Sequence, residues 1–420
     1  MEQKEIFKLI IATFHKKDLP SFKPRELETP EIKKVISITG SRRSGKTYYF
    51  YQKISELLNK IAKNRIVYIN LSDERLYPLK LNDLQYILEA YYELYPQNKN
   101  KKIFLFLDEV QEVEGWERFV RRVYDTENVG IFVTGSSSKL LHKEIHTSLR
   151  GRTLNYTMFP LSFREFLDFN GITLEKNFQY SDQRYAIKKL LKEYLNNGGF
   201  PEVTINKQKG ELLENYMELI IYKDIIERYK IRNLALIKNL MKYLLTNIST
   251  LFTVNSYHKA VSKEMAIKQE TISEYLSYLE DAYVIFTVNL FSYSLKQQQA
   301  NPRKIYCIDN GLRNVVSFKF SKDGGRLAEN MVFVELKRRD KDIYYWAGKG
   351  EVDFVVKNKD NSLTAINVSY TNKIEEREIN ALLDFKNKFS KTKKLIILTK
   401  NLEKKEKGIE FIPLWKWLLD

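Results

Sequence analysis

Residues 40–47 read Gly-Ser-Arg-Arg-Ser-Gly-Lys-Thr, which is a complete G-x-x-x-x-G-K-[ST] phosphate-binding pattern. The six residues before the loop are mostly β-branched, as in a short buried strand, and residues 48–58 have the apolar spacing of a helix. A strand, a glycine loop and a helix in this order constrain this part of the chain to an α/β fold. The pattern therefore predicts a site for the phosphates of a nucleoside triphosphate.

The residue types in the loop suit this chemistry. Gly40 and Gly45 permit backbone conformations that a side chain would block, so that successive N–H groups can face a phosphate. Lys46 is expected to reach the β- and γ-phosphates, and the hydroxyl of Thr47 is expected to bind Mg²⁺. The residues assigned to phosphate binding are Gly40, Ser41, Arg42, Arg43, Ser44, Gly45, Lys46 and Thr47.

A second strand ends in a pair of acids. Residues 103–107 are all apolar, as in a central parallel strand buried on both faces, and Asp108 and Glu109 follow them. We expect Asp108 to share the Mg²⁺ with Thr47, and Glu109 to polarise the attacking water. The alternative is an acidic pair that only solvates the strand end. On the first interpretation Lys46, Asp108 and Glu109 are the catalytic residues.

Three serines follow a third predicted strand at residues 130–135. Ser136 is placed to sense the γ-phosphate if this strand ends beside the nucleotide loop. The serine cluster could equally cap a helix that begins at Lys139. Arg42 and Arg43 also have two interpretations, because they could neutralise phosphate or pin the loop to the acids at 73–74.

These segments resemble an AAA-type ATPase family common in archaea and bacteria. The resemblance is carried by residues 38–47, 107–111, 134–138, 148–152, 159–166 and 194–202. It implies that the nucleotide is ATP, and that the ATPase core precedes a winged helix and a C-terminal PD-(D/E)XK nuclease-like domain of uncertain function. It also implies that Arg150 or Arg152 contacts the γ-phosphate, in the same chain or from a neighbouring subunit. The alternative is that both are ordinary ion-pairing arginines.

The amino-acid composition limits which cofactors and partners we expect. One cysteine and four histidines argue against a disulfide framework and a zinc site, and no apolar run reaches the roughly 18–20 residues of a membrane span. The N-terminal apolar run at 6–14 lacks a signal-peptide cleavage site, so we expect a cytoplasmic protein. The net charge of +17 favours a polyanion such as nucleic acid, although lysine-rich surfaces also serve only solubility.

Residues 235–290 have the element order of a winged helix, followed by a strand at 304–308. The predicted recognition helix would place polar side chains near its N-terminal end, at Lys268, Gln269, Thr271 and Ser273. Winged helices also bind proteins, and three glutamates in this segment weaken the case for DNA. Double-stranded DNA and a protein partner therefore both stay open, as does the choice between a monomer and a homo-oligomer.

The C-terminal region has a nuclease-like order of helix, hairpin and strand. Glu329 and Asp353 stand where the first two metal-binding acids of such a nuclease belong. Asn367 and Ser369 replace the expected Glu and Lys of the third motif, and an amide is a poor ligand for a hard divalent ion. We therefore predict a vestigial, non-cleaving domain.

The predicted architecture is α/β in three parts. These are a P-loop parallel-sheet ATPase core at 1–170, a helical lid and winged helix at 171–300, and an α/β nuclease-like domain at 301–420, with strand 304–308 assignable to either neighbour. The predicted function is Mg²⁺-dependent ATP binding and hydrolysis that drives a conformational switch associated with nucleic acid. The alternatives are a nucleotide-gated protein-interaction switch and, less favoured, an ATP-coupled nuclease.

Overall fold

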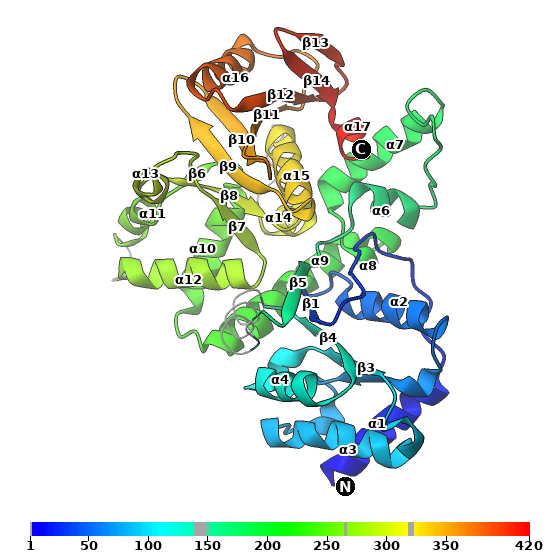
Figure 1. Cartoon of the computed structure of the whole chain (residues 1–420). Helices are drawn as coiled ribbons and strands as arrows, with labels where there is room; N and C mark the ends of the chain where they lie inside the picture. Colours follow the sequence, from blue (N-terminus) through cyan, green and yellow to red (C-terminus); the bar gives the residue numbers. More distant parts are fainter. Residues whose placement is uncertain (1, 138–148, 150, 264–266, 318–322) are drawn as a thin grey trace. The chain divides into compact units, whose positions relative to one another are not determined.

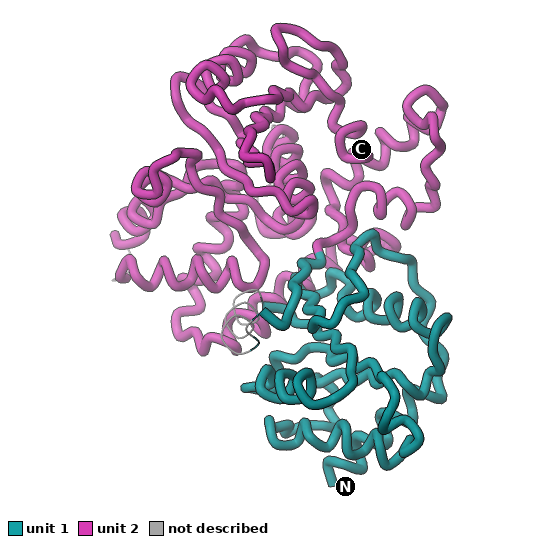
Figure 2. The backbone as a smooth tube through the Cα atoms, in the orientation of Figure 1, with its two compact units in different colours: residues 1–158 teal, residues 159–420 magenta. Residues whose placement is uncertain are grey.

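The computed structural model describes the chain except for residues 1, 138–148, 150, 264–266 and 318–322. Two compact units divide at residue 158: unit 1 spans Met1–Met158 and unit 2 spans Phe159–Asp420 (Figure 2). The first division thus comes earlier than the predicted residue 170. The predicted second and third domains lie in one compact unit, because one hydrophobic core runs from Phe159 to Leu419.

Unit 1 contains a five-stranded parallel sheet in the order β2-β3-β4-β1-β5 (Figure 1). Its strands are β1 (Val35–Thr39), β2 (Ile66–Asn70), β3 (Ile103–Asp108), β4 (Val129–Gly135) and β5 (Thr153–Thr157). Every residue of β1 is buried, as expected for a strand covered on both faces. Since all neighbours are parallel, β1, β3 and β4 present their carboxyl ends at one edge of the sheet.

Helices cover both faces of this sheet. The helix α2 (Lys46–Leu58) packs on one face, where Phe50 meets Phe106 with ring centroids 5.1 Å apart. The other face is covered by α1 (Gln3–Lys16), α3 (Gln85–Leu94) and α4 (Trp116–Thr126). Short 3₁₀ turns complete the unit at Lys63–Arg65, Glu74–Leu76, Leu81–Leu84, Pro96–Asn98 and Val110–Glu112. The predicted P-loop α/β core is therefore confirmed.

Unit 2 begins with helices and a small sheet. The helices are α6 (Phe163–Phe169), α7 (Gln183–Asn197), α8 (Pro201–Ile205), α9 (Lys209–Leu219), a π-helix (Ile220–Glu227), α10 (Leu234–Thr246), α11 (Val254–Val261), α12 (Gln269–Asp281) and α13 (Leu295–Ala300). The strands β6 (Leu251–Phe252), β7 (Ile285–Val288) and β8 (Arg303–Cys307) form an antiparallel sheet in the order β6-β8-β7. The strand that the sequence left unassigned at 304–308 therefore pairs with the preceding region.

The rest of unit 2 is built on a six-stranded mixed sheet in the order β13-β14-β12-β11-β10-β9. Its strands are β9 (Asp342–Ala347), β10 (Glu351–Lys357), β11 (Leu363–Ser369), β12 (Thr392–Thr399), β13 (Lys404–Glu406) and β14 (Ile409–Pro413). The helices α15 (Gly324–Arg338) and α16 (Glu376–Lys388) pack into the hydrophobic clusters on its opposite faces. Two further helices, α14 (Asn310–Val316) and α17 (Leu414–Trp417), flank this region (Figure 1).

The glycine pair of segment 194–202 has a structural explanation within unit 2. The carboxylate of Asp309 accepts hydrogen bonds from the backbone N–H groups of Gly199 and Gly311, both at 2.7 Å. Gly198 has a φ of +73°, and a Cβ there would lie 1.9 Å from an Asp309 oxygen. Gly198 is therefore needed because a buried acid occupies the space of its side chain, whereas a Cβ on Gly199 would lie 2.7 Å from the carbonyl oxygen of Leu161.

Candidate nucleotide-binding site

The loop after β1 has a backbone that requires glycine. Gly40 has a φ of +152°, and a Cβ on it would lie 2.2 Å from the carbonyl oxygen of Met158. Gly45 has a φ of +100° and directly precedes α2. The loop therefore turns tightly and leads into the amino end of α2, where the helix dipole and N–H groups favour an anion.

Lys46 is buried and lies across the loop. Its Nζ donates to the carbonyl oxygens of Gly40 and Ser41, both at 3.1 Å, and lies 4.0 Å from Oε1 of Glu109. These partners are two neutral carbonyls and one more distant carboxylate. The ammonium group can therefore exchange them for phosphate oxygens.

Asp108 lies at the end of β3 and is fully buried. Its Oδ2 accepts hydrogen bonds from Thr47 at 2.7 Å and from Tyr68 at 3.1 Å, and its Oδ1 accepts one from Thr134. Burial, followed by the neighbouring charge of Glu109, raises the pKa of Asp108. The structure thus brings together Thr47 and Asp108, the two residues predicted to bind Mg²⁺.

Glu109 is held in a different environment. Its backbone has a left-handed φ of +56°, and its N–H donates to Oγ1 of Thr134 at 3.0 Å. Its Oε2 accepts a hydrogen bond from Nε2 of Gln111 at 2.5 Å, and the same nitrogen lies 3.5 Å from Oγ of Ser136. The side chain of Glu109 is 19% exposed, whereas that of Asp108 is inaccessible. The turn after β3 therefore leaves only the second acid accessible to a water molecule.

The residues present fit a phosphate and a divalent ion. The hydroxyl oxygens of Ser41 and Ser44 are buried and have no hydrogen-bond partner among the described residues. Buried polar groups are normally paired, so these hydroxyls favour a polar ligand at the loop. Thr47 and Asp108 supply hydroxyl and carboxylate oxygens, which are the ligands that Mg²⁺ prefers.

Sequence reasoning gave no role to four supporting residues, although Gln111 and Thr134 lie in segments that carry the family resemblance. Arg25 is buried, and its Nη1 donates to the carbonyl oxygen of Ser44 at 2.7 Å. Its backbone is fixed in turn by Gln52, whose Oε1 accepts from the N–H of Arg25 at 2.7 Å. The other three, Tyr68, Gln111 and Thr134, orient the acidic pair. No local pattern identifies Arg25, because its contact joins residues far apart in the sequence.

The structure bears differently on the predictions for Arg150, Arg152 and the loop arginines. Arg152 precedes β5 and pairs with Asp125, with Nε 2.9 Å from Oδ1. This places Arg152 at the amino edge of the parallel sheet, opposite the nucleotide loop, so it does not contact a nucleotide in the same chain. A role toward a neighbouring subunit stays a prediction.

Arg150 and the helix expected from Lys139 lie outside the described residues. Asp73, a suggested partner of the loop arginines, binds Arg75 instead, at 2.6 Å.

A second group of carboxylates lies in unit 2 around Lys304 of β8. The Lys304 ammonium is buried, 3.0 Å from Glu329, 3.0 Å from Asp353 and 2.5 Å from Glu351. Burial alone would lower the pKa of Lys304, but Asp353 and Glu329 raise it well above its usual value. Burial raises the pKa of Glu329 to about 7, and the charge of Asp353 adds to this effect. A lysine side chain therefore provides a positive charge beside Glu329 and Asp353, the two acids that occupy nuclease-like positions in the sequence.

Asn367 has a structural role beside this group. Its Oδ1 accepts from the backbone N–H of Asp353 at 3.1 Å, and its Nδ2 donates to Glu378 at 2.9 Å. Ser369 ends β11 without supplying a positive charge. Within the described part of the chain, no group of three or more His, Cys, Asp or Glu side chains is arranged to hold a metal ion.

The fold and this site define an ATPase domain of the AAA class, and comparison with known proteins agrees. Residues 32–167 match an AAA domain, residues 188–323 a domain of unknown function (DUF8612) and residues 324–417 another (DUF4143). An uncharacterized protein of Methanocaldococcus jannaschii is 38% identical over 416 residues, covering 94% of this chain and 90% of that protein. One of Haemophilus influenzae is 30% identical, covering 91% of this chain and 93% of that protein. The chain therefore belongs to the family of these proteins.

Solved structures are more distant. A Walker-type ATPase of Pyrococcus abyssi aligns with a TM-score of 0.44 and 14% identity, covering 75% of this chain and 94% of that chain. The Orc1 protein of Aeropyrum pernix, solved in complex with DNA, aligns with a TM-score of 0.29 and 10% identity, covering 75% and 91%. We draw no functional conclusion from likenesses at these scores. Over the described residues, no helix is both long and apolar enough to cross a membrane.

Proposed function

We propose that this protein binds and hydrolyses Mg²⁺–ATP at the loop of unit 1 and uses the nucleotide state as a conformational switch. The observation that carries the proposal is the hydrogen bond of 2.7 Å between Thr47 and Asp108, beside a Glu109 that Gln111 holds. Lys46 binds the β- and γ-phosphates once it leaves its two carbonyl partners. Mg²⁺, held by Thr47 and Asp108, supplies neutralisation of the phosphate charge.

Glu109 is the proposed general base. Its carboxylate is partly exposed and can accept a proton from an attacking water, while its hydrogen bond to Gln111 fixes its direction. Ser136 lies beside Gln111 and is the proposed link between the γ-phosphate and this pair. Asp108 is too deeply buried to reach the same water, so the two acids have separate roles.

The proposed partner is double-stranded DNA. Its support is the net charge of +17 and the element order from α10 to β8, which resembles that of a winged helix with α13 inserted before β8. In this comparison α12 is the recognition helix, and Lys268 and Gln269 are exposed at its amino end. The rival proposal is a protein partner, which the glutamates of α12 favour.

ATP turnover with and without duplex DNA, at two salt concentrations, tests these proposals. Stimulation by DNA that fades as salt rises is expected, because phosphate contacts release counterions. Turnover in wild type that is indifferent to DNA would favour the protein partner. Lys46→Ala should lose nucleotide binding and with it ATP turnover. Turnover that persists in this variant would come from a contaminating ATPase.

A nuclease is the least supported function. Lys304 is in contact with Glu329, Glu351 and Asp353, and Asn367 stands where a third metal-binding acid is needed. Metal-dependent cleavage of DNA that Asp353→Ala abolishes would overturn this assignment.

A further inference from the structure

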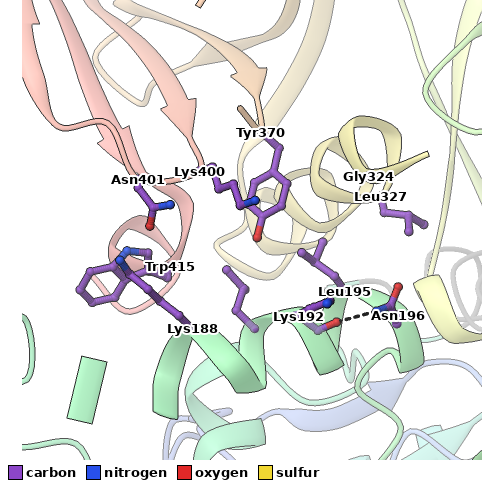
Figure 3. Close-up of a pocket in the computed structure, with 11 residues that line it drawn as sticks. Lys188, Lys192, Leu195, Asn196, Gly324, Leu327, Tyr370, Lys400, Asn401 and Trp415 are labelled. Carbon is purple, nitrogen blue, oxygen red and sulfur yellow. Dashed lines mark hydrogen bonds between the residues drawn. The ribbon is translucent and has the colours of Figure 1, made fainter. Parts of the chain in front are cut away.

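A cavity of about 340 Å³ lies within unit 2, away from the carboxylate group around Lys304. Its walls come from five separate parts of the chain: α7, the start of α15, the end of β11, the end of β12, and α17 (Figure 3). Three lysines line it, namely Lys188 and Lys192 of α7 and Lys400 after β12. The residues at 188 and 192 are one helical turn apart, so they share a face of α7.

The cavity is electrostatically one-sided. No acidic side chain lines it, and no carboxylate among the described residues pairs with its three ammonium groups. The acids nearest in sequence are already neutralised elsewhere: Glu193 by Lys209, Asp323 by Arg313 at 2.6 Å, and Glu403 by Lys416 at 2.6 Å. The three lysines are therefore a concentration of uncompensated positive charge around a concave surface.

A buried donor in the cavity wall also lacks a partner. Trp415 is 3% exposed, and its indole Nε1 forms no hydrogen bond with the described residues. Buried N–H groups are usually satisfied, so this one favours a ligand that accepts hydrogen bonds. The amino end of α15 lies at the same cavity through Gly324, and the side chain of Asp323 makes no capping bond there. Its first N–H groups add to the same preference for an anion.

The remaining wall is apolar and aromatic. Tyr370, which follows β11, and the leucines at 191, 195 and 327 line the cavity beside the lysines (Figure 3). A planar ring can pack against such a surface while a charged group meets the lysines. The volume is within the usual range of small-ligand sites.

We propose that this cavity binds a phosphate monoester carried on a planar ring, that is, a nucleotide, independently of the loop at 40–47. The phosphate contacts Lys188, Lys192 and Lys400, and the base packs beside Tyr370. The nucleotide can be free in solution or can be the 5′-phosphorylated end of a nucleic-acid strand.

The test uses the full chain with Lys46→Ala, so that the nucleotide loop of unit 1 does not contribute. The probes are AMP against adenosine, by calorimetry, and a 5′-phosphorylated single-stranded oligonucleotide against its 5′-hydroxyl form, by fluorescence anisotropy. Binding that requires the phosphate is expected. AMP binding alone would assign a free nucleotide, and oligonucleotide binding alone would assign a strand end.

Two substitutions locate the binding. Lys188→Gln and Lys400→Gln should each weaken it by about tenfold, because each removes a charged hydrogen-bond donor. Lys189→Gln, on the same helix but outside the cavity, should leave the affinity unchanged. Unchanged thermal melting of all three variants excludes misfolding as the cause. The proposal is wrong if no phosphorylated probe binds at millimolar concentration, if the unphosphorylated probes bind equally, or if the cavity variants bind like the control.

Discussion

Both units bury a lysine side chain, but the two lysines differ in what neutralises them. Lys46 has two carbonyl oxygens at 3.1 Å and one carboxylate at 4.0 Å. Lys304 has three carboxylates within 3.0 Å and a neighbouring tyrosine, Tyr306, that donates to Glu329 at 2.7 Å. The first lysine keeps its charge available for a ligand. The second is satisfied within the protein.

The surrounding polar atoms follow the same division. Near Lys46, the hydroxyls of Ser41 and Ser44 lack partners among the described residues. Near Lys304, both oxygens of Asp353 are engaged, one by the lysine and the other by the N–H of Val368 at 2.9 Å. The proposed nucleotide site and the ion-pair cluster around Lys304 therefore share residue types but differ in whether their polar groups are satisfied within the protein.

The largest effect should come from Glu109→Gln. It removes the proposed base but keeps the size and shape of the side chain and one oxygen that can accept from Gln111, so turnover should fall by about 10²–10⁴-fold. Nucleotide affinity should stay close to wild type. Phosphate release and equilibrium binding measure the two properties separately, and Glu114→Gln, an exposed neighbour, is the matched control. Turnover at the wild-type rate would show that another group activates the water.

Lys304→Met tests the other side of the comparison. It leaves three carboxylates facing one another without a cation, and breaking a buried ion pair in this way costs about 3–5 kcal/mol. Hydrogen exchange in β8 and β10 should rise accordingly, while ATP turnover persists at temperatures where both units stay folded. The control is Lys393→Met, which breaks an exposed pair with Asp360 and should leave the stability nearly unchanged because solvent screens that pair.

The companion substitution Asp353→Asn sharpens this test. Added to Lys304→Met, it removes one of the unpaired charges and should restore part of the lost stability. If the losses of unfolding free energy in the two single variants simply add up in the double variant, the two side chains do not interact.

Asp309 predicts a pH dependence in unit 2. Burial raises the pKa of Asp309 from 3.8 to about 6, although it accepts hydrogen bonds from Gly199, Gly311 and Leu312. The folded state therefore holds this proton more tightly than the unfolded chain. The resulting stabilisation is fully present below about pH 4 and is lost as the pH rises through about 6, by about 3 kcal/mol at most.

Asp309→Asn should abolish this contribution. The measurement is the difference in unfolding free energy between wild type and variant, followed from pH 4 to pH 7 by fluorescence, since three of the four tryptophans lie in unit 2. The advantage of wild type over Asp309→Asn in unfolding free energy should be largest near pH 4. It should shrink toward pH 7, because ionised Asp309 destabilises wild type. A pH-independent difference would mean that Asp309 titrates with an ordinary pKa.

The sequence predicted the parts of the molecule that depend on local patterns. The glycine loop, the apolar strand before Asp108 and Glu109, and the hairpin and strand around Asp353 were all found from runs and spacings. The role of Lys304 was missed, because one lysine in a short strand carries no sign of the acids that β10 and α15 bring to it. The continuous core of unit 2 was also not visible in the sequence, since it is a property of packing.

Arg25 shows the same limit at the nucleotide site, and it gives the smallest predicted effect. Its guanidinium donates to the Ser44 carbonyl and so holds the loop from outside the motif. Arg25→Gln should raise the KM for ATP by about three- to tenfold, because one charged hydrogen bond that positions the loop is lost. The kcat should change little, since Glu109 and Lys46 stay in place. Lys17→Gln, an exposed change in the same N-terminal region, is the control. A fall in kcat with no change in KM would instead show that Arg25 stabilises the transition state. The loop would then depend on a buried charge for catalysis and not only for ATP binding.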